Sequence, residues 1–385
     1  MQSPTTNHAA AFAAVDSRLR PYGAAMARVV VGMSGGVDSS LAAALVREAG
    51  HEVVGITLKL WPCAEEDGGF ARADACCSPT ETIDARASAL KSGVAHFVID
   101  AEDDFRRDVV DPFIEAWKRG ETPNPCIRCN ESIKFGTLWR RARDLGAERV
   151  ATGHYARTER AFDRWVLRRS VDVAKDQCYF LFSLTQEQLA AAEFPVGHLT
   201  KEQVRAAAAA RGLPTAAKHE SMDICFTGAD GSEGFLRRAA PDAFAPGPII
   251  LADDGRVLGE HRGLCGYTVG QRQGLGVAWT EPLFVTAIDR ARNAVVVGPR
   301  AALMTPTARL RACTWHLGPL PAGGLDCLVR TRHRAKPVRA LITADGEEAV
   351  VTYAEAQPRS NTGQACVAYA LDDGWCLGGG WFTPS

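Results

Sequence analysis

The sequence contains no run of about 18 consecutive apolar residues, so no membrane-spanning helix is expected. It also has almost no net charge, because 44 Lys and Arg stand against 45 Asp and Glu. This balance excludes a globally basic nucleic-acid-binding protein but leaves room for a local basic patch. With 46% hydrophobic and 23% charged residues, the composition excludes disordered and collagen-like proteins.

Residues 1–22 do not have the pattern of a secretory leader, since they are polar and alanine-rich and have no apolar stretch after a basic start. We expect residues 1–26 to be a disordered extension, with a weak organelle-targeting segment as the alternative. The chain has 12 cysteines, but its 385 residues can bury a core without a disulfide framework. We therefore expect a cytoplasmic protein in which some cysteines serve catalysis or bind metal.

Strand and helix patterns alternate from Arg28 to Gly153. This alternation predicts a doubly wound α/β domain with a parallel sheet over residues 27–212. The short apolar runs typical of buried parallel strands lie at 28–32, 53–60, 96–99 and 149–153. Helical spacing of apolar residues occurs at 39–48, 82–92, 105–119 and 132–145.

The texture of the sequence changes after Leu213. Residues 239–248 are rich in proline and alanine, which marks a linker. From Ile249 onward, short apolar runs alternate with glycine-containing turns, a pattern typical of a β-rich domain such as a barrel. We expect a small central domain over residues 213–276, which carries a single cysteine at 225, and a C-terminal β-barrel domain over 277–385.

The segment Ser34–Ser40, SGGVDSS, connects the first strand to the first helix. Its glycines would let the backbone approach a phosphate, and the N–H groups of a helix start attract an anion. Asp38 would repel phosphates unless it holds a Mg²⁺ ion that bridges their oxygens. The segment lacks the lysine of the Walker A motif, and an ordinary strand–helix turn is the alternative. As a whole it resembles the PP-loop of ATP pyrophosphatases, which cleave ATP to AMP and pyrophosphate while adenylating a substrate.

Cys126 and Cys129 form a CxxC motif in the segment PNPCIRCN. The prolines predict that the two thiols lie on a turn and not inside a helix. Arg128 and Lys134 would lower the pKa of a nearby thiol. A redox pair or half of a zinc site are alternatives, although no second CxxC follows. Cys225 stands alone, and by itself would more often be a buried core cysteine.

Several motifs occur in order, and through them the chain resembles the tRNA-specific 2-thiouridylases from about Val29 to Phe382. Family members adenylate the C2 oxygen of the wobble uridine (U34) of certain tRNAs, and a cysteine persulfide then replaces that oxygen by sulfur. The resemblance implies a PP-loop ATP pyrophosphatase domain, ATP and Mg²⁺ as cofactors, the anticodon arm of tRNA as substrate and a sulfur-donor protein as partner. The matching segments are GMSGGVDSS (Gly32–Ser40), TPNPCIRCNESIKF (Thr122–Phe135), ATGHYAR (Ala151–Arg157), KDQCYFL (Lys175–Leu181), DICF (Asp223–Phe226), YTVGQRQGLG (Tyr267–Gly276), GQACVAY (Gly363–Tyr369) and LGGGWF (Leu377–Phe382).

The same resemblance implies that Cys129 is the nucleophile and that Cys225 carries the persulfide, with a redox-active Cys129–Cys225 disulfide when sulfur is released. Many members have Asp where this chain has Cys126. The departure leaves a second mechanism open, because Cys126, Cys129 and Cys225 together could hold a [4Fe–4S] cluster, as in related tRNA thiolases. Another PP-loop adenylating synthetase is a third interpretation, but it explains neither the CxxC motif nor the β-rich tail. We expect the persulfide route.

Binding residues are implied in the same way. ATP contacts are expected at Gly32, Met33, Ser34, Gly35, Gly36, Val37, Asp38, Ser39, Leu58 and Gly153, with Mg²⁺ held through Asp38. The target uridine is expected to face Asn124, Pro125 and Cys126, and further tRNA contacts are expected at His154, Lys175, Asp176, Gln177, Arg332, His333 and Gln364.

A basic segment near the C-terminus is visible without the resemblance. Residues 328–339 contain no acid, and Arg330, Arg332 and Arg334 alternate. On a strand these three side chains would share one face and form a stripe suited to RNA phosphates, with a solvated strand face as the alternative.

Two groups of cysteines are expected outside the site. Cys63, Cys76 and Cys77 are expected on a surface loop with acidic neighbours, and Cys178, Cys265, Cys313, Cys327, Cys366 and Cys376 are expected to be structural.

Overall fold

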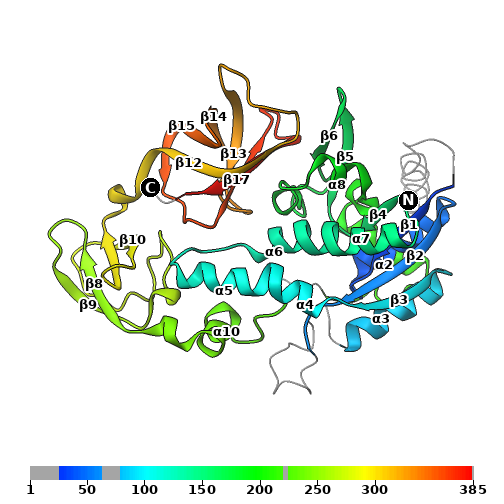
Figure 1. The fold of residues 1–385 in the computed structure, drawn as a ribbon, viewed down its shortest axis with the longest axis horizontal. Helices are drawn as coiled ribbons and strands as arrows, with labels where there is room; N and C mark the ends of the chain where they lie inside the picture. Colours follow the sequence, from blue (N-terminus) through cyan, green and yellow to red (C-terminus); the bar gives the residue numbers. More distant parts are fainter. Residues whose placement is uncertain (1–25, 63–78, 220–223, 384–385) are drawn as a thin grey trace, which may run out of the picture. The chain divides into compact units, whose positions relative to one another are not determined.

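The computed structural model describes residues 26–62, 79–219 and 224–383 (Figure 1). All but Met26 of the expected N-terminal extension, together with Cys63, Cys76 and Cys77, lies outside the described residues. The chain divides into two compact units, of which the first is Met1–Asp108 with Arg128–Ala229 and the second is Val109–Ile127 with Asp230–Ser385. No helix in the described ranges has the length and apolar character that crossing a membrane requires. The cytoplasmic location stays a prediction.

The first unit is built on a parallel sheet with the strand order β3-β2-β1-β4-β7. Its central strand is fully buried, since Val29, Val30 and Val31 have no exposed surface, as expected for a strand covered on both faces. The predicted doubly wound α/β domain is confirmed. The strands are β1 (Arg28–Gly32), β2 (Glu52–Lys59), β3 (Ala95–Asp100), β4 (Arg149–Thr152) and β7 (Ala192–Glu193).

Helices and a hairpin complete this unit. Leu41 and Leu45 of α2 belong to one core cluster with Val204 and Ala207 of α9, so the alanine-rich α9 packs closely on α2. The helices are α2 (Val37–Glu48), α3 (Pro79–Lys91), α4 (Glu102–Phe105), η1 (Arg106–Val110), η2 (Cys129–Thr137), α7 (Leu138–Asp144), η3 (Cys178–Phe180), α8 (Gln186–Ala191), η4 (Pro195–His198) and α9 (Lys201–Ala210). The hairpin is formed by β5 (Ala156–Ala161) and β6 (Arg164–Arg169).

The strand order of this sheet leaves a crevice at the carboxyl ends of its strands. The chain leaves β1, forms α2 and returns as β2 on one side of β1, whereas β4 pairs on the other side. At such a reversal of strand order, the carboxyl ends of the two flanking strands leave a crevice for ligands. The residues after β1 and after β4 therefore meet at the position where open α/β sheets bind nucleotides.

The CxxC segment is helical, so the prediction of a turn was wrong. Helix α6 (Pro125–Arg128) runs directly into the π-helix η2, which begins at Cys129. Pro125 occupies the first helical position, where a missing N–H costs nothing and a fixed φ favours the helix. Asn124 Oδ1 accepts a hydrogen bond from the Cys126 backbone N–H at 3.1 Å, as an N-cap residue does. The prolines thus start a helix.

The second unit begins with α5 (Asp111–Lys118) and α6 and continues with α10 (Gly231–Ala239) and η5 (Pro241–Phe244). A small mixed sheet of order β10-β11-β8-β9 follows, with its own apolar core. It uses β8 (Gly247–Leu251), β9 (Val257–His261), β10 (Phe284–Asp289) and β11 (Ala294–Gly298), with η6 (Leu264–Gly266) between β9 and β10 and η7 (Arg300–Leu303) after β11.

The last six strands close into a barrel in the order β12-β15-β14-β13-β16-β17, and β17 pairs back onto β12. Its interior contains Leu310, Val329, Ile342, Val351 and Phe382, all of which are buried. The predicted C-terminal β-barrel is confirmed, whereas the segment boundaries at 212–213 and 276–277 stay predictions. The strands are β12 (Met304–Trp315), β13 (Leu325–Arg330), β14 (Val338–Asp345), β15 (Glu348–Pro358), β16 (Ala365–Tyr369) and β17 (Trp375–Phe382).

Closure of the barrel depends on a glycine run in β17. A Cβ atom at Gly379 would lie 2.2 Å from the carbonyl oxygen of Cys366 in β16. We expect Gly379→Ala to lower the free energy of unfolding of the second unit by about 1–3 kcal/mol, because overpacking at a backbone contact forces the strands apart. The matched control is Gly323→Ala, whose Cβ meets nothing within 4 Å. Urea unfolding followed by tryptophan fluorescence measures both, and equal stability of the two variants would contradict the expectation.

Candidate nucleotide and thiol site

The loop after β1 is held in shape by its own serines. Ser39 Oγ accepts a hydrogen bond from the Ser34 N–H at 3.1 Å and donates one to the Gly36 carbonyl at 3.1 Å. Gly35 has φ of +77°, and a Cβ there would lie 2.2 Å from the carbonyl oxygen of Glu81. A glycine is therefore required at this position on both counts.

Helix α2 begins directly after this loop without a side-chain cap. Its N-cap residue is Gly36, which has no side chain to accept a bond from the first-turn N–H groups. Those N–H groups and the positive end of the helix dipole are suited to an anion such as a phosphate. The loop and the helix start together therefore have the features expected of a phosphate site. They lie at the end of the sheet where the carboxyl ends of β1 and β4 meet.

Asp38 lies in the first turn of α2 and is held from two directions. Lys201 Nζ, at the start of α9, lies 2.8 Å from each carboxylate oxygen, and the Tyr155 hydroxyl donates a hydrogen bond to Oδ1 at 2.8 Å. Both members of the ion pair are partly buried, with 11% of the Lys201 side chain and 28% of the Asp38 side chain exposed. A carboxylate has about four lone-pair directions and three are used here, so one remains for a metal ion or water. The carboxylate therefore fits Mg²⁺, which usually takes only one or two protein carboxylates beside phosphates and water.

A second lysine, Lys218, contacts the backbone of the loop. Lys218 Nζ donates to the Gly35 carbonyl at 3.2 Å and lies 2.7 Å from Glu81 Oε1, and it also contacts the Asp84 carboxylate. Hydrogen bonds to Asp84 and Glu81 raise the pKa of Lys218, against the effect of its burial. Lys218 thus joins the loop to the start of α3 and stays charged.

The other expected nucleotide contacts, Leu58 and Gly153, also lie at the carboxyl ends of the strands. Leu58 is the penultimate residue of β2, and Gly153 follows β4 directly. A Cβ at Gly153 would lie 2.6 Å from the backbone nitrogen of Ser39. Because Gly153 has no side chain, the chain after β4 can pack directly against the start of α2. The sequence alone did not predict this contact.

The two candidate catalytic thiols belong to the first unit. Phe226, next to Cys225, packs against Phe105 of α4 with ring centroids 5.7 Å apart and against Trp61 at 6.1 Å. Helix α4 also contacts the helix that begins with Cys129, since Thr137 Oγ1 donates to Asp104 Oδ2 at 3.0 Å. Helix α4 therefore anchors both the Cys225 loop and the Cys129 helix.

Cys126, Cys129 and Cys225 differ from most of the other described cysteines in exposure, with Cys313 as the exception, since it is also partly exposed. Cys129 and Cys225 are partly exposed, and Cys126 is exposed. Burial raises the pKa of Cys313 to about 11 and that of Cys327 to about 12, so both stay protonated thiols inside the barrel. Within the described ranges, no three His, Cys, Asp or Glu side chains form a group that could hold a metal ion.

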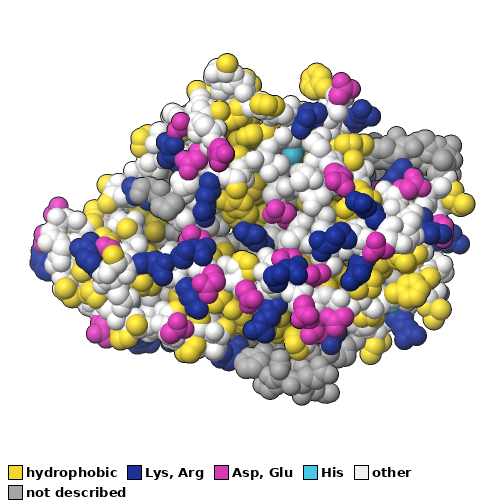
Figure 2. Space-filling model, in the orientation of Figure 1, with side chains coloured by type: hydrophobic (Ala, Val, Ile, Leu, Met, Phe, Trp, Pro, Cys, Tyr) yellow, Lys and Arg dark blue, Asp and Glu magenta, His cyan; other side chains and the backbone are white. Residues whose placement is uncertain are grey.

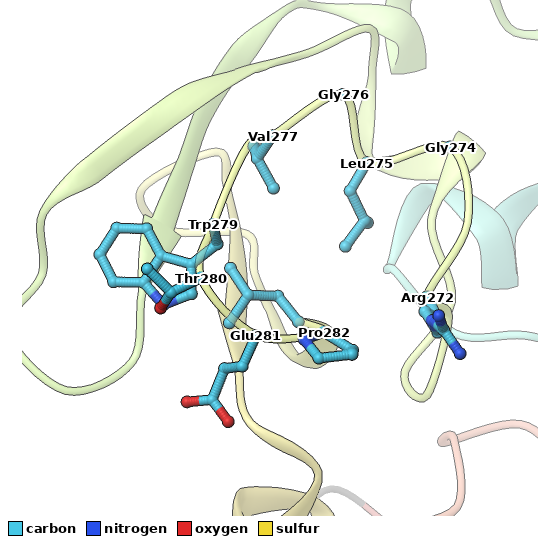
Figure 3. A pocket seen from close by; sticks show the side chains of 10 residues that line it. Arg272, Gly274, Leu275, Gly276, Val277, Trp279, Thr280, Glu281 and Pro282 are labelled. Carbon is cyan, nitrogen blue, oxygen red and sulfur yellow. The ribbon is translucent and has the colours of Figure 1, made fainter.

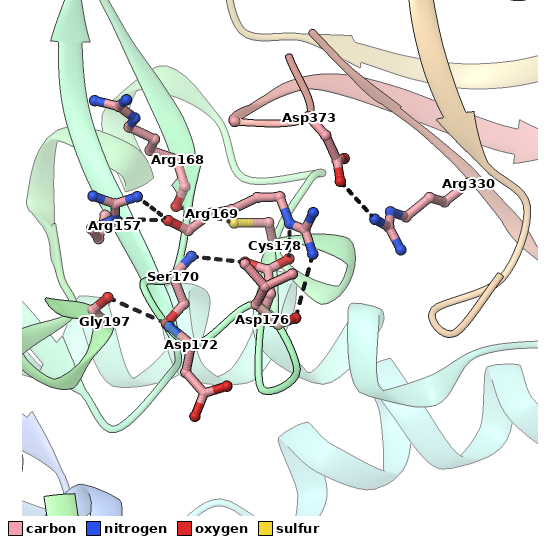
Figure 4. A network of polar contacts seen from close by, with 12 residues as sticks. Arg157, Arg168, Arg169, Ser170, Asp172, Asp176, Cys178, Gly197, Arg330 and Asp373 are labelled. Carbon is pink, nitrogen blue, oxygen red and sulfur yellow. Dashed lines mark hydrogen bonds and ion pairs between the residues drawn. The ribbon is translucent and has the colours of Figure 1, made fainter. Parts of the chain in front are cut away.

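Three expected tRNA contacts in the first unit form hydrogen bonds within the protein. Asp176 is buried, lies 3.3 Å from the Arg169 guanidinium and accepts from the Ser170 N–H at 3.0 Å (Figure 4). Gln177 Oε1 accepts from the Tyr155 N–H at 2.9 Å. His154 is 8% exposed and has a partner at each ring nitrogen. The role of these residues, and of the partly exposed Lys175, as tRNA contacts stays a prediction.

In the second unit, Gln364 holds the segment that precedes the CxxC motif. Gln364 Nε2 donates to the Thr122 carbonyl at 2.7 Å, and Asn361 Nδ2 donates to Thr122 Oγ1 at 2.9 Å. Asn361 Oδ1 also accepts from the Val269 N–H at 2.9 Å. The turn before β16 therefore fixes the chain just ahead of Asn124, Pro125 and Cys126.

The prediction of an arginine stripe on a strand was wrong. Strand β13 ends at Arg330, and Arg332 and Arg334 lie exposed in the turn that follows. Arg330 lies 3.0 Å from the Asp373 carboxylate and 5.4 Å from the Tyr369 ring, so its guanidinium is paired with residues of the second unit (Figure 4). The alternation would place the three side chains on one face of a strand, but β13 ends at Arg330, two residues before Arg332 and four before Arg334.

No large surface of one charge is visible on the face drawn in Figure 2, where Lys and Arg are interspersed with Asp and Glu.

The second unit also contains a pocket of about 460 Å³ in its YTVGQRQGLG region, lined by Arg272, Leu275 and Trp279 among others (Figure 3). Its lining comes from residues 272–283, none of which the sequence assigned to the nucleotide.

Sequence reasoning missed the residues that hold Asp38 and the loop. Tyr155 lies inside the quoted GHYAR motif and could have been found as a polar residue beside Gly153. Lys201 lies 163 residues from Asp38, and Lys218 lies 183 residues from Gly35, so no local pattern joins them. Only the packing of α9 on α2 brings the first pair together.

Comparison with known proteins agrees with this architecture. Three family descriptions match in order: tRNA methyl transferase HUP domain over residues 27–229, tRNA methyl transferase PRC-barrel domain over 233–299 and Aminomethyltransferase beta-barrel domain over 306–382. A tRNA-specific 2-thiouridylase MnmA from Geotalea uraniireducens is 46% identical over 92% of this chain and 94% of its own length. The corresponding protein from Parvibaculum lavamentivorans is 45% identical over 92% of this chain and 90% of its own length.

Among solved structures, the U34-tRNA thiolase NcsA from Methanococcus maripaludis with its [4Fe-4S] cluster is 16% identical, with a TM-score of 0.35 over 61% of this chain and 73% of that one. This likeness is too weak to carry an argument. The HUP-domain match spans more than half of the chain, and the two MnmA relatives match across nine-tenths of it. The chain therefore belongs to the tRNA-specific 2-thiouridylase family.

Proposed function

We propose that the protein is an ATP-dependent tRNA-uridine 2-sulfurtransferase, which converts the wobble uridine U34 of its tRNA substrates to 2-thiouridine. The observation that carries the proposal is the presence, in one compact unit, of an uncapped helix start with Asp38 and of two partly exposed cysteines, Cys129 and Cys225. The names of the matched relatives support the same substrate and reaction. ATP is the adenylating substrate, and a sulfur-donor protein reloads the enzyme.

In the first half-reaction, the loop from Gly32 to Ser39 binds the ATP phosphates through its backbone N–H groups, and Leu58 and Gly153 border the nucleotide. Mg²⁺, when bound at Asp38, neutralises charge on the leaving pyrophosphate. Lys201 and Tyr155 keep the Asp38 carboxylate in one orientation. The uridine C2 oxygen attacks the α-phosphorus, and pyrophosphate leaves.

In the second half-reaction, Cys225 carries a persulfide whose terminal sulfur attacks C2 while AMP leaves. Cys129 then attacks the inner sulfur of Cys225, which forms the Cys129–Cys225 disulfide and releases 2-thiouridine. A cellular thiol reductant returns the disulfide to two thiols before the donor adds the next sulfur. Two thiols are required because one holds the transferable sulfur and the other breaks its attachment.

The target base must leave its stack in the anticodon loop, because C2 is inaccessible inside stacked RNA. Asn124, Pro125 and Cys126 are proposed to face the flipped uridine. Further contacts to the tRNA are proposed at Lys175, Asp176, Gln177, Arg332, His333 and Gln364. Of these, Arg332 is exposed and suits a phosphate contact.

Adenylation gives the first test. We expect Asp38→Asn to slow tRNA-dependent pyrophosphate release by about a hundredfold or more, because the neutral amide would hold Mg²⁺ less tightly and leave the charge of the departing pyrophosphate less compensated. Binding of tRNA should stay within a factor of about two, since Asp38 serves the phosphates. The matched control is Glu48→Gln on the same helix, whose carboxylate pairs with Arg211 at the surface. Wild-type pyrophosphate release by the Asp38 variant would contradict the assignment.

The cysteines give the second test, which separates the persulfide from the iron–sulfur mechanism. In the persulfide mechanism, Cys129→Ser and Cys225→Ser each abolish thiolation, and Cys126→Asp, which restores the residue of many relatives, keeps substantial activity. The measurement is single-turnover thiolation of tRNA by metal-free protein loaded with persulfide. Activity that appears only after anaerobic reconstitution with about four irons per chain, and is lost in Cys126→Asp, would establish the cluster mechanism instead.

A further inference from the structure

Two lysines, Lys201 and Lys218, contact the nucleotide loop and the start of α2, and a third, Lys134, contacts the residue that follows Gly153. Lys201 faces the Asp38 carboxylate, and Lys218 faces the carboxylates of Glu81 and Asp84. Lys134, in η2, forms no ion pair with any carboxylate of residues 26–62, 79–219 and 224–383. Its Nζ instead lies 3.1 Å from His154 Nε2. A partly buried ammonium without a counter-charge is suited to an anionic ligand.

The partner of Lys134 is fixed in one protonation state. An ammonium group only donates, so His154 Nε2 must accept, and Nδ1–H then donates to Thr152 Oγ1 at 2.8 Å. Burial, together with the charge of Lys134, holds the pKa of His154 well below its ordinary value of 6.5. The imidazole packs against Phe135 and Phe194, with ring centroids 6.4 and 6.1 Å away. His154 is therefore a rigid, neutral acceptor.

The position of this pair relates it to the two parts of the site. Lys134 lies about one π-helical turn after Cys129 on the same helix. His154 follows Gly153, whose Cα faces the backbone of Asp38 and Ser39 so closely that a Cβ would lie 2.6 Å from Ser39 N. Lys134 therefore joins the helix of the candidate nucleophile, through His154, to the segment that packs against the start of α2. All of these residues belong to the first unit.

We propose that Lys134 contacts the α-phosphate during adenylation and that His154 is its positioning residue. This inference rests on the proposed function. In the step, the uridine C2 oxygen forms a bond to the α-phosphorus, the bond to the bridging oxygen breaks with its electron pair leaving on pyrophosphate, and the uridine N3 proton passes to water. Lys134 keeps its proton and stabilises negative charge on the non-bridging α-phosphate oxygens.

This role assigns His154 a different task from a direct tRNA contact. Because both of its ring nitrogens are used within the protein, the imidazole acts on the substrate through Lys134. Gln at position 154 would still place an acceptor, Oε1, near the position of Nε2, whereas Leu would fill the space without one. The two substitutions therefore separate packing from positioning.

The experiment measures tRNA-dependent pyrophosphate release in a single turnover, together with the Kd of a non-hydrolysable ATP analogue and of tRNA. We expect Lys134→Met to lower the rate by about 10²–10³, the usual cost of losing one preorganised contact to a developing charge. Both Kd values should change by less than a factor of about three. Lys134→Arg should recover part of the rate, His154→Gln most of it, and His154→Leu should lose at least about tenfold. Lys91→Met, an exposed lysine at the end of α3, is the matched control.

Three results would overturn the inference. The first is a wild-type rate of pyrophosphate release in Lys134→Met. The second is a normal adenylation rate in Lys134→Met with a defect confined to persulfide transfer, because Lys134 would then serve the thiol. The third is equal loss in His154→Gln and His154→Leu, with normal ATP and tRNA affinities. Failure of the proposed function is distinguishable, since the wild-type protein itself would then release no pyrophosphate with tRNA.

Discussion

The ion pair between Lys201 and Asp38 is the contact on which the nucleotide site depends. It joins the first turn of α9 to the first turn of α2, and Tyr155 adds a third member from the residue that follows His154. Because both charges are partly buried, removal of either would leave the other without compensation in a poorly solvated position. The carboxylate is therefore oriented before any ligand arrives.

The start of α9 is itself held by the network around the KDQ segment. Lys201 N–H donates to Asp172 Oδ2 at 2.9 Å, and the Asp172 N–H donates to Ser170 Oγ at 3.2 Å. The Ser170 N–H in turn donates to the buried Asp176 (Figure 4). A segment expected to contact tRNA thus also fixes the lysine that orients Asp38, so substitutions there are expected to affect adenylation as well as RNA binding.

The sequence predicted the α/β domain well where local pattern and tertiary environment agree. The apolar run of β1 was assigned to its correct residues, and the α2 helix was found to within two residues of its start. The CxxC segment was misassigned because proline ends helices in their interior but starts them at the first position, and Pro125 occupies that first position. The arginine stripe failed because Arg332 lies beyond the end of β13.

The contacts that sequence reasoning could not supply are long-range. Lys201 and Asp38 meet only because the small residues of α9 pack against α2, and the acceptor role of His154 depends on a lysine 20 residues away in another element. The family resemblance marked Asp38 and His154 as important but gave no partner for either. Side-chain geometry supplied those partners and changed the expected role of His154.

The central claim is that ATP activates the C2 oxygen of uridine before sulfur arrives. Transcribed tRNA with ¹⁸O at C2 of U34 tests this directly, when it is incubated with the enzyme, Mg·ATP and a persulfide donor in ordinary water. The account predicts that the ¹⁸O leaves in the phosphate of AMP, with one labelled AMP for each 2-thiouridine formed, as measured by mass spectrometry of both products. Unlabelled AMP together with 2-thiouridine, or label recovered in pyrophosphate, would contradict it.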